Sequence, residues 1–407
     1  MGADLRDLLA KHREPSTAID VRRLHRERHA KLQAEMARQG VDVALLLHAP
    51  NVAYATGQPV RGIDVTHAIY ERPVAIVVTG EDRPHLLWDD AGSGPGLDVE
   101  RHPSVWPELD EGAVLLAGVL ADVAGSRDRI AVDEITGAMQ RAGVLSDASM
   151  LEATQVIGPA KLAKTADELG CIAEAQRRNE AAMVATQAMV RPGVRRSEVA
   201  GEFLAQLVPH GVEANLIDPI FQPMPRSIAD GPRTTTGDVA FPTGVGDPVL
   251  AERDLVWVDT GVDHLGYASD FGRTWIVGRD PDPGQQRLFE RWCAVMVAVL
   301  DGLGPGVSGG ELCRAATAAN GDRRPWLPHF YLAHGLGVES AEMPLIGTDL
   351  GPEFDDNLVL APGMVLVLEP VIWEDGVGGY RAEEIIAVTE DGWRHLGSGH
   401  AYPPFTS

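Results

Sequence analysis

Residues 254–274 read DLVWVDTGVDHLGYASDFGRT, two strand-like runs joined by a turn that contains glycine. The first run is apolar from Leu255 to Val258 and ends in Asp259, and the second run carries Asp270. Runs of this kind predict a β-hairpin with a long loop. An aspartate at a strand end is also a common turn residue. Because facing acids on buried apolar arms are costly without a positive partner, we expect a metal ion between Asp259 and Asp270.

Three further residues of metal-ligand type follow, each in or beside a short β-rich run. His334 lies in YLAHGLG, Glu369 in MVLVLEP and Glu383 in RAEEIIAV. Alternation along a strand places Glu369 on the same face as Val367 and points Glu383 away from Glu384. A single histidine is more often structural than a ligand, and a glutamate before proline is also typical of an exposed strand end. The joint order Asp, Asp, His, Glu, Glu favours one metal site.

This donor set contains four carboxylates and one imidazole. Hard oxygen donors with a single nitrogen favour Mn²⁺, Co²⁺, Fe²⁺ or Zn²⁺ over the metals of thiolate sites. Four negative charges match two divalent metal ions, and a pair of ions bridged by carboxylates is a common device for hydrolysis. The pattern therefore predicts a metallohydrolase with two divalent cations.

The segments DTGVDHLGYASDFGRT, HGLG, LEP and RAEE resemble the pita-bread metallopeptidase family, which includes methionine aminopeptidase, aminopeptidase P, prolidase and the non-peptidase creatinase. The segment RERHAKLQAEMARQGVDVALLLHAPNVAYATG is similar to the N-terminal domain of creatinase and prolidase. The resemblance covers nearly the whole chain. It implies an α+β fold with a C-terminal pita-bread catalytic domain (residues 161–407), a smaller α/β N-terminal domain (residues 1–160), and a homodimer.

The resemblance also implies a role for each ligand. Asp259 would bind one metal ion, His334 and Glu369 the other, and Asp270 and Glu383 would bridge the two. Glu369 would help to deprotonate the bridging water. The leading functional hypothesis is an enzyme of the Xaa-Pro peptidase type, which cleaves a small amide or dipeptide with a metal-bridging hydroxide.

Two positions depart from the prolidase pattern. Thr243 in AFPTG and Ala341 in HGLGVESAEMP stand where prolidase-type members carry histidines. In the family these histidines hold the substrate and stabilise the tetrahedral intermediate, so the loss of both weakens transition-state binding by several kcal/mol. The metal ligands are complete, whereas the peptidase groups around them are not.

This departure motivates two alternative functions. The first is a metal-dependent lyase or C–N hydrolase acting on a small carboxylated metabolite. GPRT (residues 231–234), HGLG and the 35-residue interval from His334 to Glu369 resemble a dimethylsulfoniopropionate lyase of this superfamily. The acidic residue of that lyase has no clear counterpart here, and Glu339 is the one candidate for its part. The second is an inactive binding protein, which five intact ligands disfavour. The candidate additional donors, each more typical of a structural residue, are Tyr331, His329, Glu339 and Arg233.

Composition limits the binding partners and the cellular compartment that we expect for this chain. The 407 residues suffice for two domains, and the net charge of −24, from 35 basic and 59 acidic residues, is spread along the chain. We therefore expect neither nucleic acid nor membrane as a partner. The three cysteines (Cys171, Cys293 and Cys313) form no CxxC pair. Together with a charged N-terminus that lacks a signal-peptide core, they predict a cytoplasmic protein.

Periodicity predicts the order of elements. Helices are expected at 21–38, 165–190, 197–208 and 286–303 and from Leu312, and strands at 41–47, 74–79, 85–88 and 130–132. Gly158-Pro159 indicates a domain boundary. Four aromatic or histidine residues of the N-terminal part are candidates for the substrate entrance, although core positions are more common for such residues: His48, His67, Trp88 and Trp106.

Overall fold

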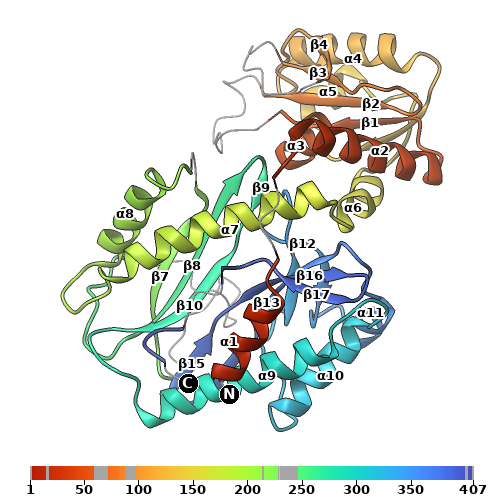
Figure 1. Ribbon diagram of the computed structural model, residues 1–407. Helices are drawn as coiled ribbons and strands as arrows, with labels where there is room; N and C mark the ends of the chain where they lie inside the picture. Colours follow the sequence, from red (N-terminus) through yellow and green to blue (C-terminus); the bar gives the residue numbers. More distant parts are fainter. Residues whose placement is uncertain are drawn as a thin grey trace. The chain divides into compact units, whose positions relative to one another are not determined.

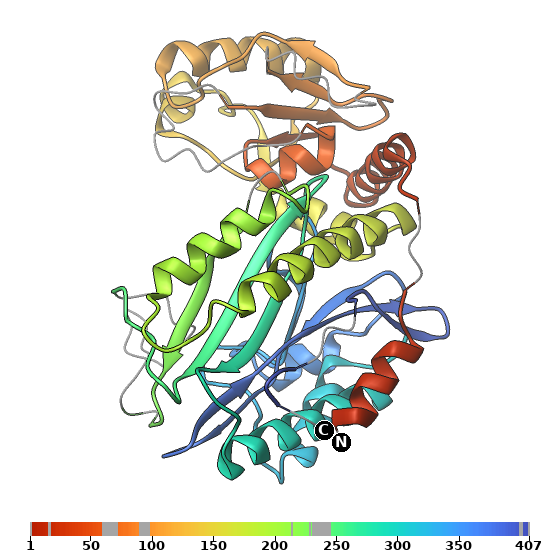
Figure 2. The ribbon, with the colours of Figure 1, turned by 60° about the vertical axis from the view of Figure 1, so that its left-hand side comes forward.

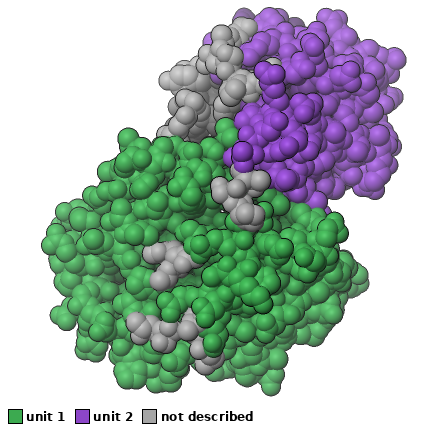
Figure 3. Space-filling model, viewed as in Figure 1, with its two compact units in different colours: residues 1–17, 168–407 green, residues 18–167 purple. Residues whose placement is uncertain are grey.

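The computed structural model describes residues 2–14, 18–58, 72–88, 98–212, 215–227, 229, 246–398 and 402–405. Two compact units are present, Ala18–Asp167 and a second unit composed of Met1–Thr17 and Glu168–Ser407 (Figure 3). The predicted boundary at residue 160 lies within the unit Ala18–Asp167, and the first residues were expected in the N-terminal domain. In the structure, the first helix belongs to the C-terminal unit. None of the helices within the described ranges is long and apolar enough to cross a membrane.

The N-terminal unit is built on one mixed sheet, with the strand order β4-β3-β2-β1-β5-β6 (Figure 1). Its strands are β1 (Val43–Leu46), β2 (Val74–Val78), β3 (His85–Leu87), β4 (Glu100–His102), β5 (Arg129–Val132) and β6 (Ser149–Glu152). Its helices are α2 (Val21–Gln39), α3 (Ala49–Thr56), α4 (Asp110–Ala124), α5 (Gly137–Ala142) and α6 (Thr154–Leu162). Strand β1 runs antiparallel to β2 and parallel to β5. This arrangement is the predicted α/β type.

Helix α2 shows how local sequence sets an element. The Asp20 side chain accepts hydrogen bonds from the first backbone amides, and Gly40 ends the helix with a positive φ of 65°. Leu24, Leu32 and Met36 recur at helical spacing and are buried. The helix predicted for 21–38 is therefore confirmed to within one residue.

Gly158-Pro159, where the sequence indicated a domain boundary, lies within a helix, because Pro159 is inside α6. A proline within a helix leaves the carbonyl four residues earlier without its usual amide donor. Here that carbonyl belongs to Gln155, and it accepts a hydrogen bond from the Gln39 side chain of α2. The tertiary contact supplies the donor that the helix lacks, so the proline is tolerated.

Within its described residues, the C-terminal unit contains three sheets with helices outside them (Figures 1 and 2). Its helices are α1 (Gly2–Lys11), α7 (Ala166–Gln187, which begins at the end of the other unit), α8 (Arg196–Leu207), α9 (Pro283–Gly302), α10 (Gly309–Ala319) and α11 (Pro352–Asn357). Its strands are β7 (Asn215–Met224), β8 (Leu255–His264), β9 (Tyr267–Ala268), β10 (Phe271–Ile276), β11 (Ala333–Gly335), β12 (Glu342–Ile346), β13 (Val365–Leu368), β14 (Val371–Glu374), β15 (Gly378–Arg381), β16 (Glu384–Thr389) and β17 (Gly392–His395).

The sheets of this unit are mainly antiparallel. One has the order β10-β8-β7 with β9 paired to β8, a second has the order β12-β11-β13-β16-β17, and β14 pairs with β15. Figure 2 shows α7 and α8 along the β7-β8-β10 sheet, and Phe203 of α8 packs in one apolar cluster with Phe221 and Trp275 of that sheet. Helices against curved antiparallel sheets are the predicted α+β architecture.

Two helices begin three residues earlier than the periodicity indicated. Asp282 caps α9 and Ser308 caps α10, and in each case the third helical residue, Gln285 or Glu311, bonds back to the capping residue. A capping box extends a helix into residues that carry no apolar period, so periodicity alone misplaces the start.

Candidate metal centre

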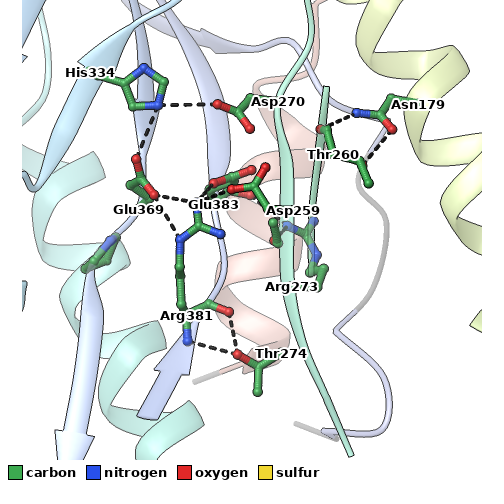
Figure 4. A network of polar contacts seen from close by, with 12 residues as sticks. Asn179, Asp259, Thr260, Asp270, Arg273, Thr274, His334, Glu369, Arg381 and Glu383 are labelled. Carbon is green, nitrogen blue, oxygen red and sulfur yellow. Dashed lines mark hydrogen bonds and ion pairs between the residues drawn. The ribbon is translucent and has the colours of Figure 1, made fainter. Parts of the chain in front are cut away.

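Five side chains from different strands converge in the C-terminal unit (Figure 4). They are Asp259 in β8, Asp270 before β10, His334 in β11, Glu369 after β13 and Glu383 before β16, and none is more than 7% exposed. The His334 Nε2 atom lies 3.3 Å from an oxygen of Asp270 and 3.2 Å from an oxygen of Glu369. The five residues predicted as metal ligands therefore lie together in the folded chain.

Strand pairing explains this convergence. In the β8–β10 pair, Asp259 stands opposite Gly272. A Cβ atom at Gly272 would lie 2.5 Å from the Arg381 guanidinium and 2.8 Å from the Glu383 carboxylate, so only glycine allows this approach. The β13–β16 register pairs Leu368 with Glu384, which brings the preceding Glu383 beside Glu369.

Arg381 lies among the acids, and the sequence analysis assigned it no role. Its Nη2 atom donates to Asp259 at 3.0 Å, to Glu369 at 2.5 Å and to Glu383 at 2.6 Å, and its Nε donates to Glu369 at 2.9 Å. Thr274 holds the Arg381 backbone through two hydrogen bonds (Figure 4). The sequence contains a signal for this contact, because Arg381 and Glu383 are two residues apart and side chains at this spacing along a strand share a face.

Arg381 leaves part of the negative charge uncompensated. One oxygen each of Asp259, Asp270 and Glu383 is buried without a hydrogen-bond partner among the residues that the structure describes. Ligand atoms of these three residues lie within 4.8 Å of one another. Buried carboxylate oxygens without donors are costly, and hard divalent cations satisfy them. The residues present therefore fit a metal ion.

The protonation behaviour of the cluster reflects this crowding. Burial, followed by the charges of Glu383 and Glu369, raises the pKa of Asp259 to about 7. Burial and the charge of Asp259 raise the pKa of Asp270 to about 6. Burial also acts on Glu369, but Arg381 and His334 outweigh it and lower the pKa of that carboxyl. The metal-free cluster thus retains protons that a cation would displace.

Two side chains of helix α7, Asn179 and Gln176, bond to the backbone at or beside the two aspartates. The Asn179 side chain donates to the Thr260 carbonyl at 2.7 Å and to the Ser269 hydroxyl at 3.1 Å, and it accepts from the Thr260 hydroxyl at 2.9 Å. The Gln176 side chain accepts from the Asp270 amide at 3.2 Å. Since Thr260 and Ser269 adjoin Asp259 and Asp270, these contacts set the spacing of the two carboxylates.

We expect Asn179→Ala to lower the free energy of unfolding by about 2–3 kcal/mol, because it leaves buried polar groups without partners. Metal affinity should fall roughly 10–100-fold, as it does when a supporting residue of a ligand is removed. Urea unfolding and a metal titration measure the two effects. Gln187→Ala on the same helix is the control and should change neither substantially. Unchanged metal affinity in Asn179→Ala would show that the hairpin holds its aspartates without α7.

Glu384 points to the opposite side of its strand from Glu383, as the sequence analysis expected. It accepts from Arg273 at 2.9 Å, from the His395 ring at 2.7 Å and from the Tyr402 hydroxyl at 2.6 Å. Burial opposes ionisation, but Arg273 and His395 overcome it and lower the pKa of Glu384 from 4.5 to about 2. This buried ion pair braces the strand that leads out of the metal-ligand cluster.

The lowered pKa of Glu384 predicts acid sensitivity. A carboxyl with a depressed folded-state pKa stabilises the fold above its ordinary pKa, and this contribution is lost as the pH falls from about 4.5 towards about 2. We expect a loss of about 3 kcal/mol over this window. Urea unfolding at several pH values should show a shallower acid dependence for Glu384→Gln, which is also less stable at neutral pH. Equal slopes in both proteins would contradict the assignment.

Among the other predicted donors, Tyr331 lies next to a metal-ligand residue, whereas His329 bonds elsewhere. The Tyr331 ring meets the His334 ring edge-on, with centroids 5.0 Å apart. His329 is exposed and bonds to Asp349, outside the cluster. Glu339 is half-buried in the segment after β11, and its backbone carbonyl accepts from Gly337 at 3.2 Å. Ala341 is exposed just before β12.

The remaining candidate residues lie either outside the described residues or in the N-terminal unit. Thr243, the GPRT segment with Arg233, and His67 lie outside the described residues. In the N-terminal unit, His48 precedes α3 and its backbone amide donates to Asp133 at 3.2 Å. Trp88 is half-buried after β3, and Trp106 is 37% exposed before α4.

Comparison with known proteins identifies the family. Residues 170–390, more than half of the chain, match the family described as metallopeptidase family M24, and residues 28–157 match the creatinase/prolidase N-terminal domain. The chain belongs to metallopeptidase family M24. Membership of this family implies divalent metal ions, in agreement with the buried acids. The family that the sequence resembled is thereby confirmed.

Two relatives and one solved structure illustrate this M24 membership. The chain is 26% identical over 378 residues to an Xaa-Pro dipeptidase of Pyrococcus horikoshii, which covers 91% of this chain and 96% of that protein. It is 30% identical over 260 residues to the uncharacterized peptidase YqhT of Bacillus subtilis, covering 62% and 67%. The crystal structure of an X-Pro aminopeptidase from Thermotoga maritima is similar in fold, with a TM-score of 0.72 at 20% identity, covering 93% and 99%.

Proposed function

We propose that this M24 protein is a metal-dependent peptidase of the Xaa-Pro type, acting on dipeptides or other short substrates. The observation that carries the proposal is the convergence of five buried ligand residues: Asp259, Asp270, His334, Glu369 and Glu383. Relatives named Xaa-Pro dipeptidase support the substrate class. Two divalent ions held by these five residues match the four carboxylate charges.

The chemistry that divalent ions supply when bound is Lewis-acid polarisation of a carbonyl oxygen and a lowered pKa of water. The chain's own groups provide proton transfer and orientation. Glu369 is kept ionised by Arg381 and His334, so it can accept a proton from the attacking water. Arg381 bonds to three of the ligand carboxylates and so orients them before substrate arrives.

Tyr331 is the neutral hydrogen-bond donor that adjoins the ligands. Burial, followed by the charges of Glu369 and Asp270, raises its pKa, so its hydroxyl stays protonated. A protonated phenol can donate to an oxygen that gains negative charge during reaction. We assign to Tyr331 part of the role that the two family histidines play elsewhere.

A second candidate function rests on Ala341. This exposed residue carries no imidazole at the position where prolidase-type members carry one. A site with intact metal ligands and without that donor also suits a lyase or C–N hydrolase that acts on a small carboxylated metabolite.

Kinetics with divalent metal present distinguish the two functions. Xaa-Pro dipeptides should be hydrolysed with a kcat of about 1–10³ per second, and Tyr331→Phe should lower kcat about 10–10²-fold while metal content is unchanged. Ala341→His should raise kcat/KM for dipeptides if peptide hydrolysis is the native reaction. No turnover of Xaa-Pro substrates by the metal-loaded wild type, together with turnover of carboxylated metabolites, would favour the second function.

Three finer predictions accompany the proposal. The donor set favours Mn²⁺, Co²⁺, Fe²⁺ or Zn²⁺, and metal analysis of the freshly purified protein identifies which is bound. The resemblance implies a homodimer, which light scattering tests. The cytoplasmic location remains a prediction from the cysteine pattern.

A further inference from the structure

A second group of metal-ligand side chains lies in the N-terminal unit, on the edge of its sheet. Strand β4 is the edge strand and pairs in parallel with β3, so that His85 stands opposite Glu100 and Leu87 opposite His102. Side chains two residues apart share a face of a strand. His85, Glu100 and His102 therefore lie on the same face of the sheet.

The two histidines lie within bonding distance of each other. His85 Nδ1 is 3.0 Å from His102 Nε2, and the ring centroids are 5.2 Å apart. Ligand atoms of His85, His102 and Glu100 all lie within 4.8 Å of one another. Two nitrogens bound to one tetrahedral zinc ion at about 2.0–2.1 Å lie roughly 3.3 Å apart, so the observed separation is close to that of a ligand pair.

The outer ring nitrogen of His85 is also held in place. Its Nε2 atom lies 3.0 Å from a carboxylate oxygen of Glu81, in the turn that precedes β3. The turn itself is tied down, because the Glu81 carbonyl accepts from His29 at 2.9 Å and from Gln33 at 3.2 Å on α2. A carboxylate on the far nitrogen fixes the tautomer and orientation of a metal-binding histidine. Glu81 thus directs the Nδ1 lone pair of His85 towards His102.

The exposure and the charge of these side chains are also compatible with a bound cation. His85 is 6% exposed, His102 is half-buried and Glu100 is exposed, so the group has a rigid inner side and an open outer side. The two glutamates, Glu81 and Glu100, together match the charge of one divalent ion.

We propose that His85, His102 and Glu100 form a second metal site, which binds one Zn²⁺-class cation with water in the remaining position. Two imidazoles and one carboxylate are ligands typical of zinc rather than of Mg²⁺ or Ca²⁺. The site joins the edge strand to β3 and stabilises this side of the N-terminal sheet. It is separate from the carboxylate-rich centre of the C-terminal unit and does not depend on the proposed peptidase function.

Zinc binding by the full-length chain tests the proposal. After chelator treatment, equilibrium dialysis against Zn²⁺ should give one zinc equivalent per chain fewer for His102→Asn than for the wild type. Dipeptide or metabolite turnover with the catalytic metal should stay unchanged in His102→Asn. Asp270→Asn should show the reverse pattern, with activity lost and this zinc equivalent retained. Arg101→Gln, between two of the ligands on the same strand, is the matched control and should bind zinc as the wild type does.

Two further tests apply if His102→Asn does not fold: a second variant, and chemical modification of the individual histidines. Glu100→Gln changes an exposed side chain and should weaken zinc binding at this site roughly tenfold or more, the scale of a lost metal contact. In the wild type, Zn²⁺ should shield His85 and His102 from acylation by diethyl pyrocarbonate, as read by mass spectrometry. Equal zinc stoichiometry and affinity in wild type, His102→Asn and Glu100→Gln, or acylation that Zn²⁺ does not change, would overturn the proposal.

Discussion

Asp270→Asn should abolish metal binding at the carboxylate-rich centre and lower kcat/KM by roughly 10³-fold or more. Loss of a residue that merely supports a metal ligand costs about 10–100-fold, and Asp270 is itself one of the proposed ligands. Its free oxygen is buried with no hydrogen-bond partner among the described residues, while its other oxygen faces His334 at 3.3 Å. Asparagine has the same shape but no charge, so it can neither bridge cations nor balance them.

The fold should survive this change. Burial and the neighbouring Asp259 already raise the pKa of Asp270 to about 6, so the metal-free chain gains little from its charge. Elemental analysis, steady-state kinetics and circular dichroism test the three expectations, with the surface variant Asp301→Asn as the control. A folded Asp270→Asn protein with wild-type activity would remove Asp270 from the metal centre and contradict the proposed mechanism.

Arg381→Met should lower the free energy of unfolding of the metal-free C-terminal unit by about 3–5 kcal/mol. The guanidinium is 2% exposed and bonds to Asp259, Glu369 and Glu383. Methionine fills part of the volume but leaves three buried carboxylates without their cation. Urea unfolding in the presence of EDTA measures the loss.

Divalent metal should restore part of this loss, since a bound cation replaces the missing positive charge and stabilises the native state by mass action. The gain in stability on adding metal is therefore expected to be larger for Arg381→Met than for the wild type. Arg287→Met is the control, because Arg287 pairs with Glu374 at 3.6 Å on the surface, and such pairs contribute at most about 1 kcal/mol. If both arginine variants unfold alike, Arg381 is not the counter-ion of the acids.

The candidate ligand set could be predicted from order and spacing because its members lie in strands or directly beside them. Asp259 and Asp270 lie on a hairpin whose pairing follows from alternation and from the turn, and Glu369 and Glu383 directly adjoin strands that pair in the structure. The direction of Glu384 followed from the two-residue period of a strand. Such local rules need no knowledge of the rest of the chain.

Helix boundaries were less predictable, since they depend on single contacts. The starts of α9 and α10 are set by Asp282 and Ser308, whose hydrogen bonds extend each helix beyond its apolar pattern. Pro159 stays within α6 because Gln39 of α2 supplies a donor to the Gln155 carbonyl. A proline followed or preceded by glycine reads as a break when that partner is unknown.

The order of the acids and their strand-like surroundings indicated the five candidate ligands, and the resemblance of these motifs to a known family implied the α+β architecture of this chain. Which side chains surround those ligands was settled only by the folded chain. Arg381 enters the acid cluster from β15, Asn179 and Gln176 reach the aspartates from α7, and His85 meets His102 across paired strands. The physical reason is that a local period reports which face a residue occupies, whereas the partner on that face comes from packing between segments far apart in sequence.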